Sequence, residues 1–330
     1  MRAVYFPGPG RVTAGHRPDP SARPGEAIVA VRASGLCHTD IEVMRGNYGD
    51  GAFPVVPGHE YAGEVVAIGP EVDGLRVGDR VVIDPNLECG ACRACLRGWA
   101  HLCERLGAYG VTVDGGLAEF CAVRADRLHA AGELGFTAAT LAEPMGCVLN
   151  GLSPLEGRIL DRALLFGAGP MGVLIGLALR NRGVVDVFIV EPDPARRALA
   201  ATFGLSALAP DAKELAALRR GCDLVVDATG APDVAEALIG YAANGGAVLL
   251  FGVCPQDARI AISPFAVFRR QLSLSGAHSL NHNIPAALTT LKAIGPQVER
   301  LVTHRLDPEA MAQVIAGARP EGAMKVQLAF

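Results

Sequence analysis

Residues 163–172 read ALLFGAGPMG, and this stretch decides the fold of the chain. The apolar residues at its start predict a short buried strand, and an apolar helix is expected from Met171 to Arg180. Between them lies a match to the pattern G-x-G-x-x-G, made up of Gly167, Ala168, Gly169, Pro170, Met171 and Gly172. A strand, a glycine-rich turn and a helix in this order are typical of a dinucleotide-binding βαβ unit.

The glycines of this motif and the acidic residue that follows it indicate how a dinucleotide would bind. Gly167 allows a tight turn, Gly169 lets a pyrophosphate approach the backbone, and Gly172 lets the helix pack closely against the strand. The helix N-terminus presents free N–H groups to the phosphates. Glu191 ends the next predicted strand, where its carboxylate would bind ribose hydroxyls and repel a 2′-phosphate. NAD is therefore favoured over NADP, but Arg196 could reach an adenosine phosphate, so the strictness of this preference stays open.

The chain around the motif changes character twice. Strands predicted over 184–190, 224–227 and 247–253 alternate with helices, one of them over 234–243, which predicts a parallel sheet. Earlier residues instead form short strands between turn signals, and the last 40 or so residues lose the alternation. The predicted class is α/β, with a β-rich domain over 1–149, a dinucleotide-binding domain over 150–288, and a return to the first domain over 289–330.

Composition excludes several classes of protein. Half of the 330 residues are hydrophobic, 19% are charged and the formal net charge is −4, so the chain is not disordered and has no basic surface for nucleic acid or an anionic membrane. Its longest apolar stretches are too short to span a bilayer. The first residues contain no apolar signal segment, and we expect a cytoplasmic protein.

Four of the nine cysteines predict a structural zinc lobe over 86–104. They have the spacing C-x2-C-x2-C-x7-C, and the residues are Cys89, Cys92, Cys95 and Cys103. Four thiolates close the tetrahedral shell of zinc and leave no position for a substrate. The alternatives are an iron–sulfur cluster, whose bacterial motif has a shorter last spacer and a following proline, and unligated thiols.

A second set of metal-ligand residues is dispersed in the sequence. Cys37, His59, Glu60 and Glu143 together offer a thiolate, an imidazole and carboxylates, and Asp40 could accept the other N–H of His59. Three protein ligands with room for water or substrate are typical of a catalytic zinc site.

At this point the chain resembles a known family over essentially its whole length. It is similar to the zinc-dependent medium-chain dehydrogenases/reductases, the alcohol and polyol dehydrogenase family. Besides the glycine motif and the cysteine lobe, the matching segments are GLCHTD (35–40), GHE (58–60), VGDRV (77–81), DGGLAE (114–119) and EP (143–144). The pair Glu143-Pro144 resembles the sorbitol, xylitol and arabinitol branch, as does AYGVTVDGG (108–116).

The resemblance implies a GroES-like catalytic domain, a Rossmann domain, two zinc ions per chain and a role for each matching residue. Cys37 and His59 are implied ligands of the catalytic zinc. Glu60 and Glu143 share the carboxylate roles, one binding the metal and one holding water, and which does which is open. Thr39 matches the hydroxyl that takes the substrate proton.

Other positions of the resemblance concern the cofactor and the proton path. His38 and Lys325 match residues that meet the pyrophosphate, and Val253 lies where a backbone group holds the nicotinamide carboxamide. Glu42 stands where the family often has the histidine that ends the proton relay, so the exit of the proton is open. Cys147 stands where valine or threonine is commoner beside the nicotinamide.

The implied function is reversible oxidation of a secondary alcohol of a polyol to a ketone, with hydride transfer to NAD. L-Threonine or an amino-cyclitol are alternative substrates, and a non-catalytic NAD-binding protein is an alternative of another class. The implied partners are a small-molecule alcohol and further copies of the chain, as a homodimer or homotetramer paired near 247–253 and the residues after it.

Overall fold

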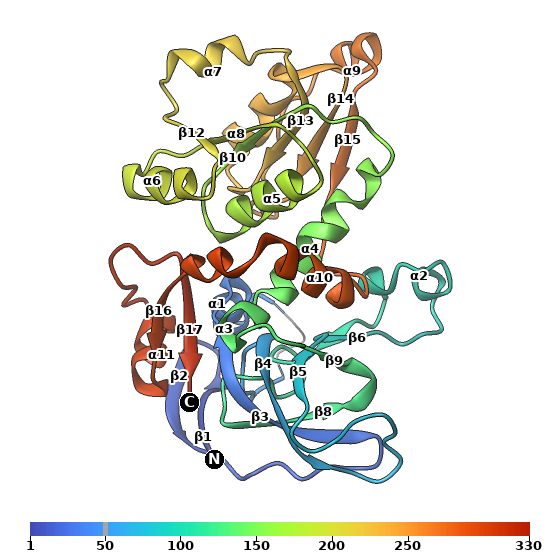
Figure 1. The fold of residues 1–330 in the computed structure, drawn as a ribbon, viewed down its shortest axis with the longest axis vertical. Coiled ribbons are helices and arrows are strands. Elements are labelled where there is room, and N and C mark those ends of the chain that lie inside the picture. Colours follow the sequence, from blue (N-terminus) through green and yellow to red (C-terminus); the bar gives the residue numbers. More distant parts are fainter. Residues whose placement is uncertain (49–51) are drawn as a thin grey trace. The chain divides into compact units, whose positions relative to one another are not determined.

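The computed structural model describes residues 1–48 and 52–330, which form two compact units. One unit contains Met1–Gly146 and Leu280–Phe330, and the other contains Cys147–Ser279. The chain therefore passes from one unit to the other between residues 146 and 147 and between residues 279 and 280, whereas the sequence predicts these boundaries at 149/150 and 288/289. The C-terminal strand, red in Figure 1, lies beside a blue N-terminal strand of the same unit.

A seven-stranded sheet is the framework of the first unit. Six strands follow the order β16-β17-β3-β4-β5-β9, and β8 also pairs with β3. The strand β17 is antiparallel to β3, and β3 is antiparallel to β4, so the beginning and the end of the chain share one sheet. The bounds are β3 (Glu26–Gly35), β4 (Glu60–Ile68), β5 (Arg80–Ile83), β8 (Phe120–Arg124), β9 (Leu128–Ala130), β16 (Val302–Leu306) and β17 (Lys325–Ala329).

Two two-stranded sheets, β1-β2 and β6-β7, and several helices complete this unit. Apolar side chains from both ends of the chain, including Phe6 and Leu328, form one buried cluster with others such as Leu117, which fixes the C-terminal segment to the N-terminal one. The remaining elements are β1 (Arg2–Gly8), β2 (Arg11–His16), β6 (Asn86–Leu87), β7 (Gly107–Ala108), α1 (His38–Arg45), α2 (Arg93–Leu96), η1 (Ala100–Leu102), η2 (Ala125–Arg127), α3 (Phe136–Ala139), α10 (Ile284–Ile294), η5 (Pro296–Leu301) and α11 (Pro308–Ile315). Helix α4 (Ala142–Leu152) begins in this unit and continues into the other.

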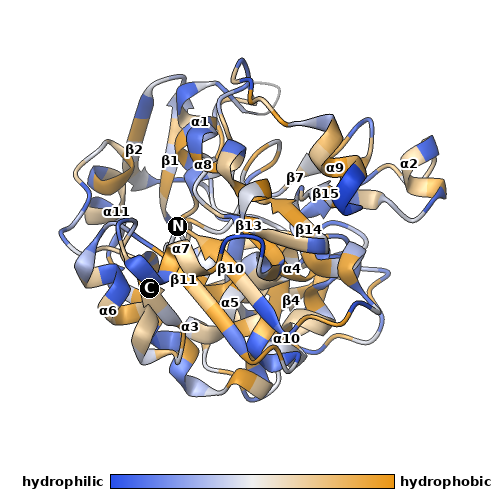
Figure 2. Ribbon diagram, turned by 90° about the horizontal axis from the view of Figure 1, so that it is seen from above, coloured by the Kyte–Doolittle hydropathy of each residue, from blue (hydrophilic) through white to orange (hydrophobic). Residues whose placement is uncertain are grey.

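The second unit contains a six-stranded parallel sheet. Its order is β12-β11-β10-β13-β14-β15, so the direction of strand addition reverses between β10 and β13. The inner strands are buried on both faces and mostly orange in Figure 2, as expected for a parallel sheet covered by helices. The bounds are β10 (Arg162–Phe166), β11 (Asp186–Val190), β12 (Ser206–Leu208), β13 (Cys222–Asp227), β14 (Ala242–Leu250) and β15 (Ser273–Gly276).

The helices of this unit correct one prediction. The expected helix over 234–243 is wrong at its C-terminal end, because α8 stops at Ala237 and a 3-10 turn, η4 (Leu238–Gly240), follows it. Ala242 already belongs to β14 and pairs with Cys222, so sheet pairing overrides local helix propensity there. The helices are η3 (Ser153–Leu155), α5 (Pro170–Asn181), α6 (Pro194–Thr202), α7 (Lys213–Ala217), α8 (Pro232–Ala237) and α9 (Pro264–Arg270).

Among the described residues, no helix combines the length and the apolar character needed to cross a bilayer.

Candidate functional site

The turn between β3 and α1 places the first residues of the dispersed cluster. Cys37 is the N-cap of α1, and Asp40 in the first helical turn accepts the backbone N–H of Cys37 at 2.8 Å. The other oxygen of Asp40 accepts the N–H of Gly58 at 3.0 Å and lies 3.4 Å from Nδ1 of His59. One fully buried carboxylate therefore joins the two loops that present Cys37 and His59.

Three of the predicted metal residues come together at this point. One ligand atom each from Cys37, His59 and Glu60 lies within 4.8 Å of the others. Because Nδ1 of His59 faces Asp40, Nε2 is the ring nitrogen left for a metal. Glu143 is also buried, in the first turn of α4, but it lies outside this set of three.

A lysine from the C-terminal strand completes the cluster. Nζ of Lys325 in β17 donates to Oε1 of Glu60 at 2.6 Å and also contacts Oε2, and both side chains are almost fully buried. Gly35 lies between them in the sheet, where a Cβ would overlap the carboxylate of Glu60 and press on the side chain of Lys325. The absence of a side chain at Gly35 therefore makes room for the ion pair.

The charges of the cluster determine its protonation. Burial alone would lower the pKa of Lys325, but Glu60, Cys37 and Glu143 together raise it, so Lys325 is an ammonium group. Burial also lowers the pKa of His59, but the charges of Asp40 and Cys37 raise it well above its usual range. The negative charges around His59 thus favour a positive charge at this position, which is either the proton on His59 or a metal ion in its place.

The donor atoms fit zinc. A thiolate, an imidazole nitrogen and a carboxylate oxygen are the ligand types of catalytic zinc sites, and all three are brought within coordinating range of one another. The Asp40 carboxylate behind His59 is the usual second partner of a zinc-ligating imidazole.

Three neighbours on α1 concern the proton path. Oγ1 of Thr39 lies 3.6 Å from Sγ of Cys37, so this hydroxyl is beside the cluster. The side chain of His38 is 75% exposed and lies 3.5 Å from Glu42. Hydrogen bonds from Asn47 and Arg45 lower the pKa of Glu42, which keeps its carboxylate ionised.

The four-cysteine lobe is assembled locally, as its spacing predicts. The ligand atoms of all four cysteines lie within 4.8 Å of one another. Sγ of Cys92 lies 3.5 Å from that of Cys95 and 3.9 Å from that of Cys103, which is too far for a disulfide bond of about 2.05 Å. Hydrogen bonds from the Ala91 backbone and the Arg105 side chain lower the pKa of Cys89 to about 6. A preformed set of four thiols, one of which ionises readily, fits structural zinc.

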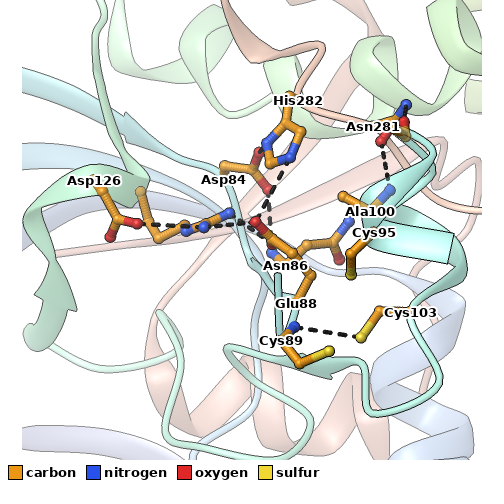
Figure 3. Close-up of polar contacts among 12 residues, drawn as sticks. Asp84, Asn86, Glu88, Cys89, Cys95, Ala100, Cys103, Asp126, Asn281 and His282 are labelled. Carbon is orange, nitrogen blue, oxygen red and sulfur yellow. Dashed lines mark hydrogen bonds and ion pairs between the residues drawn. The ribbon is translucent and has the colours of Figure 1, made fainter. Parts of the chain in front are cut away.

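A polar cluster that the sequence did not reveal lies at the base of this lobe (Figure 3). Arg127 donates two hydrogen bonds of 2.8 Å to Glu88, and His282 lies 3.6 Å from both Glu88 and Asp84. Asn281 accepts the N–H of Ala100. Its side-chain amide also donates to the carbonyl of Gly98. The start of the C-terminal part of this unit, at Asn281 and His282, is therefore hydrogen-bonded and ion-paired to the lobe and its base. In the sequence, the only hint of this contact is the pair of polar residues Asn281 and His282.

The glycine motif of the second unit has the geometry that a pyrophosphate needs. Gly167 has φ +100°, a conformation that favours glycine, and a Cβ on Gly172 would overlap the carbonyl of Gly167. A Cβ on Gly169 would meet nothing within 4 Å, so open space lies beside its backbone. Pro170 and Met171 begin α5, whose N-terminus faces this turn.

Glu191 is fixed beside the glycine turn. Its two oxygens accept the N–H groups of Ala168 at 2.8 Å and of Asp193 at 3.0 Å, and the side chain is 5% exposed. Arg196 is half-buried in the first turn of α6, one residue before Arg197, which donates to the carbonyl of Glu191. This places one acid and two cations around the end of β11.

The loops after β13 and β14 contribute a residue that the sequence analysis missed. Asp227 ends β13, is fully buried, and accepts the backbone N–H and the hydroxyl of Thr229. A Cβ on Gly230 would overlap the backbone carbonyl of Val253. The residue Val253 is 91% exposed. Both loops lie at the carboxyl ends of parallel strands, and β13 flanks the reversal of strand order, where open α/β sheets bind ligands.

Two family models match the chain. The model described as "Alcohol dehydrogenase GroES-like domain" matches residues 23–133, and the model described as "Zinc-binding dehydrogenase" matches residues 170–293. The expected fold class, a GroES-like domain with a Rossmann-type parallel sheet, is confirmed.

Known proteins similar to this chain include dehydrogenases of sugar alcohols. D-Altritol 5-dehydrogenase of Agrobacterium fabrum is 48% identical over 334 residues, which cover 100% of this chain and 99% of that protein. D-Arabinitol dehydrogenase 1 of Uromyces fabae is 32% identical over 314 residues, covering 92% and 90%.

The fold is also that of solved dehydrogenases. A crystal structure from Sinorhizobium meliloti 1021, described as a zinc-binding dehydrogenase bound to NADP, superposes with a TM-score of 0.94 at 27% identity and covers 100% of this chain and 99% of that one. The expectation of a zinc-dependent, nicotinamide-using enzyme is confirmed, and the reading as a non-catalytic protein is set aside. The chain belongs to the zinc-dependent medium-chain dehydrogenases, in their polyol dehydrogenase branch.

Proposed function

We propose that the protein oxidises a secondary alcohol of a sugar alcohol to a ketone, reversibly, and transfers the hydride to NAD. The observation that most supports this is the convergence of Cys37, His59 and Glu60 within 4.8 Å, with Asp40 and Lys325 bonded behind them. The high identity to an altritol dehydrogenase supports a polyol as the substrate.

Zinc at this cluster would act as a Lewis acid toward the substrate hydroxyl. We assign Glu60 as the carboxylate ligand, because one of its oxygens lies within the set of three while Lys325 balances its charge. Glu143 is then the second carboxylate of the site, directed at water or substrate. Thr39 takes the substrate proton, since its hydroxyl is beside Cys37. Lys325 serves Glu60 in this proposal, instead of a pyrophosphate.

Four thiolates of the lobe would bind a second, structural zinc ion, so the proposed content is two zinc ions per chain. The lobe has no open ligand position, and we assign it no step in the reaction.

The experiment that tests the proposed activity is a screen for NADH formation with a panel of alcohols. The panel contains altritol, arabinitol, xylitol, sorbitol, ribitol, galactitol, butanediol and threonine. We expect turnover with at least one five- or six-carbon polyol, at a kcat/KM well above that for threonine. The best substrate is then tested with His59→Ala, and a variant that keeps full polyol oxidation would overturn the site assignment.

The preference for NAD is a separate proposal, supported by the buried Glu191 carboxylate at the end of β11. We expect kcat/KM with NAD to exceed that with NADP about 10-fold or more, because a carboxylate there repels a 2′-phosphate. Glu191→Gln should reduce the ratio by removing the charge. Equal efficiency of the native enzyme with both cofactors would show that Arg196 and Arg197 outweigh Glu191.

We also propose that two copies pair through β15. Among the described strands, β15 pairs with β14 alone, so its other edge is open. Phe265 and Phe268 on α9 are 69% and 80% exposed, and Leu274 of β15 is 38% exposed. Light scattering should give a mass of two or four chains, and Leu274→Arg should lower it. A native monomer would contradict this proposal.

A further inference from the structure

A second buried polar residue of the C-terminal strand contacts the turn that precedes Glu143. Gln327 is fully buried in β17, two residues after Lys325. Its Nε2 donates to the carbonyl of Thr137 at 3.0 Å and to the hydroxyl of Thr140 at 2.6 Å. Thr140 is itself fully buried and lies three residues before Glu143. The side chain of Gln327 therefore bridges β17 and α3, whose C-cap Thr140 lies two residues before the start of α4.

The position of Gln327 in the sheet links it to the metal cluster. Side chains two residues apart on a strand point to the same face, so Gln327 and Lys325 are on one face of β17. Gln327 is paired with Gly35 across the sheet, and Gly35 is paired with Glu60. Glu143 follows Thr140 by three residues and is itself buried, in the first turn of α4. Lys325 thus acts on one acid of the site, and Gln327 on the segment that holds the other.

Burying the side-chain amide of Gln327 in a strand costs free energy. Within the described residues its Oε1 has no hydrogen-bond donor, and a buried acceptor without a donor destabilises a fold. Gln327 is fully buried, so its amide loses contact with water, a cost that an apolar side chain would not have. What an apolar residue could not do is hold Thr137 and Thr140.

We propose that Gln327 is a positioning residue of the catalytic site, which sets the place of Glu143 through the Thr137–Thr140 turn. The inference rests on the proposed function, in which Glu143 is the second carboxylate of the site. Gln327 itself touches neither zinc nor substrate. Its loss should let the first turn of α4 shift, and the environment of the metal with it, while the sheet stays folded.

The test compares Gln327→Met with Leu328→Met. Both changes place methionine at a fully buried position of β17, but only the first removes the hydrogen bonds to the turn. We expect kcat for the polyol to fall about 10- to 100-fold in Gln327→Met, because a small displacement of a group that faces the substrate is enough to slow the reaction, while the KM for NAD stays within twofold. Leu328→Met should keep kcat within about twofold, because a volume-conserving swap is well tolerated.

A spectroscopic measurement tests the same point without substrate. Cobalt(II) is exchanged for zinc at the Cys37–His59–Glu60 cluster, and its visible absorption bands report the ligand field. We expect the bands to shift in Gln327→Met and to match the native ones in Leu328→Met. Because no turnover is involved, this result stays interpretable even if the native enzyme oxidises none of the polyols.

A second variant guards against simple misfolding. Thr140→Val removes the hydroxyl that accepts from Nε2 and leaves Gln327 in place. It should reproduce the cobalt shift in part, and the double variant should be no worse than Gln327→Met alone, since both act on one contact. Native cobalt bands in Gln327→Met, with kcat equal to that of Leu328→Met, would overturn the proposal. The same holds if the two single effects add in full.

Discussion

The two cysteine-containing clusters of the first unit are constructed in opposite ways. The lobe takes four thiols from residues 89–103, and its helix α2 has no buried residue. The other cluster takes Cys37 from the turn before α1 and His59 and Glu60 from the start of β4, and adds Lys325, which is 265 residues from Glu60. We expect the first cluster to need a metal ion to hold its loop together, whereas the second depends on a folded sheet to bring its residues together.

The largest expected effect comes from removing a ligand of the dispersed cluster. His59→Ala should reduce polyol turnover about 1,000-fold or more, because Lewis acidity worth several kcal/mol is lost. NAD binding, followed by fluorescence titration, should change less than twofold. His16→Ala, at an exposed histidine of β2, is the matched control and should keep native turnover.

In the lobe, the same kind of change should affect stability instead of chemistry. Cys95→Ser should remove one zinc ion and lower the free energy of unfolding by several kcal/mol, since metal binding and folding of such a loop are coupled. Turnover per folded molecule should fall only a few-fold. Cys254→Ser, at a free and half-buried cysteine, should leave zinc content and stability unchanged. If Cys95→Ser instead abolishes turnover of well-folded protein, the lobe is more than structural.

A smaller effect is expected from filling the gap in the sheet at Gly35. Gly35→Ala places a methyl group against Glu60 and Lys325, so activity should fall about 10- to 100-fold. Gly15→Ala in β2 is the control, because a Cβ on that strand glycine makes only ordinary van der Waals contact, the nearest at 3.7 Å. Equal kinetics of the two variants would mean that the Glu60–Lys325 pair can move without consequence.

The smallest effect concerns the bond between the lobe and residue 281. Asn281→Ala removes the contacts to Gly98 and Ala100, which should cost about 1–2 kcal/mol and speed the release of lobe zinc to a chelator. Saturating zinc should restore native turnover. Asn181→Ala, at the exposed end of α5, should release zinc at the native rate.

Features encoded within a few neighbouring residues could be predicted from the sequence. The cysteine spacing and the glycine motif each place their residues by local geometry. In the structure the four cysteines converge, and the glycine motif forms the turn before α5. The loop acids and His59 were identified by residue type and by resemblance. The turn formed by Cys37 and Asp40 has its own local signal, an acid at the third helical position.

Contacts between distant segments could not be predicted in this way. Lys325 and Gln327 lie on the last strand, and only the pairing of β17 with β3 reveals which residues they reach. A lysine and a glutamine in an otherwise apolar strand do indicate that buried partners exist, because buried polar groups need hydrogen-bond partners. They do not indicate which residues those partners are. The end of α8 was misplaced for the same reason, since pairing with β13 determines where β14 begins.

Zinc content measured together with NADH formation tests most directly whether the dispersed cluster is the catalytic metal site. The native chain should contain two zinc ions, and His59→Ala and Cys95→Ser should contain one each. Only His59→Ala should lose polyol turnover. A His59→Ala protein that keeps both zinc ions, or that oxidises the polyol at the native rate, would contradict the assignment.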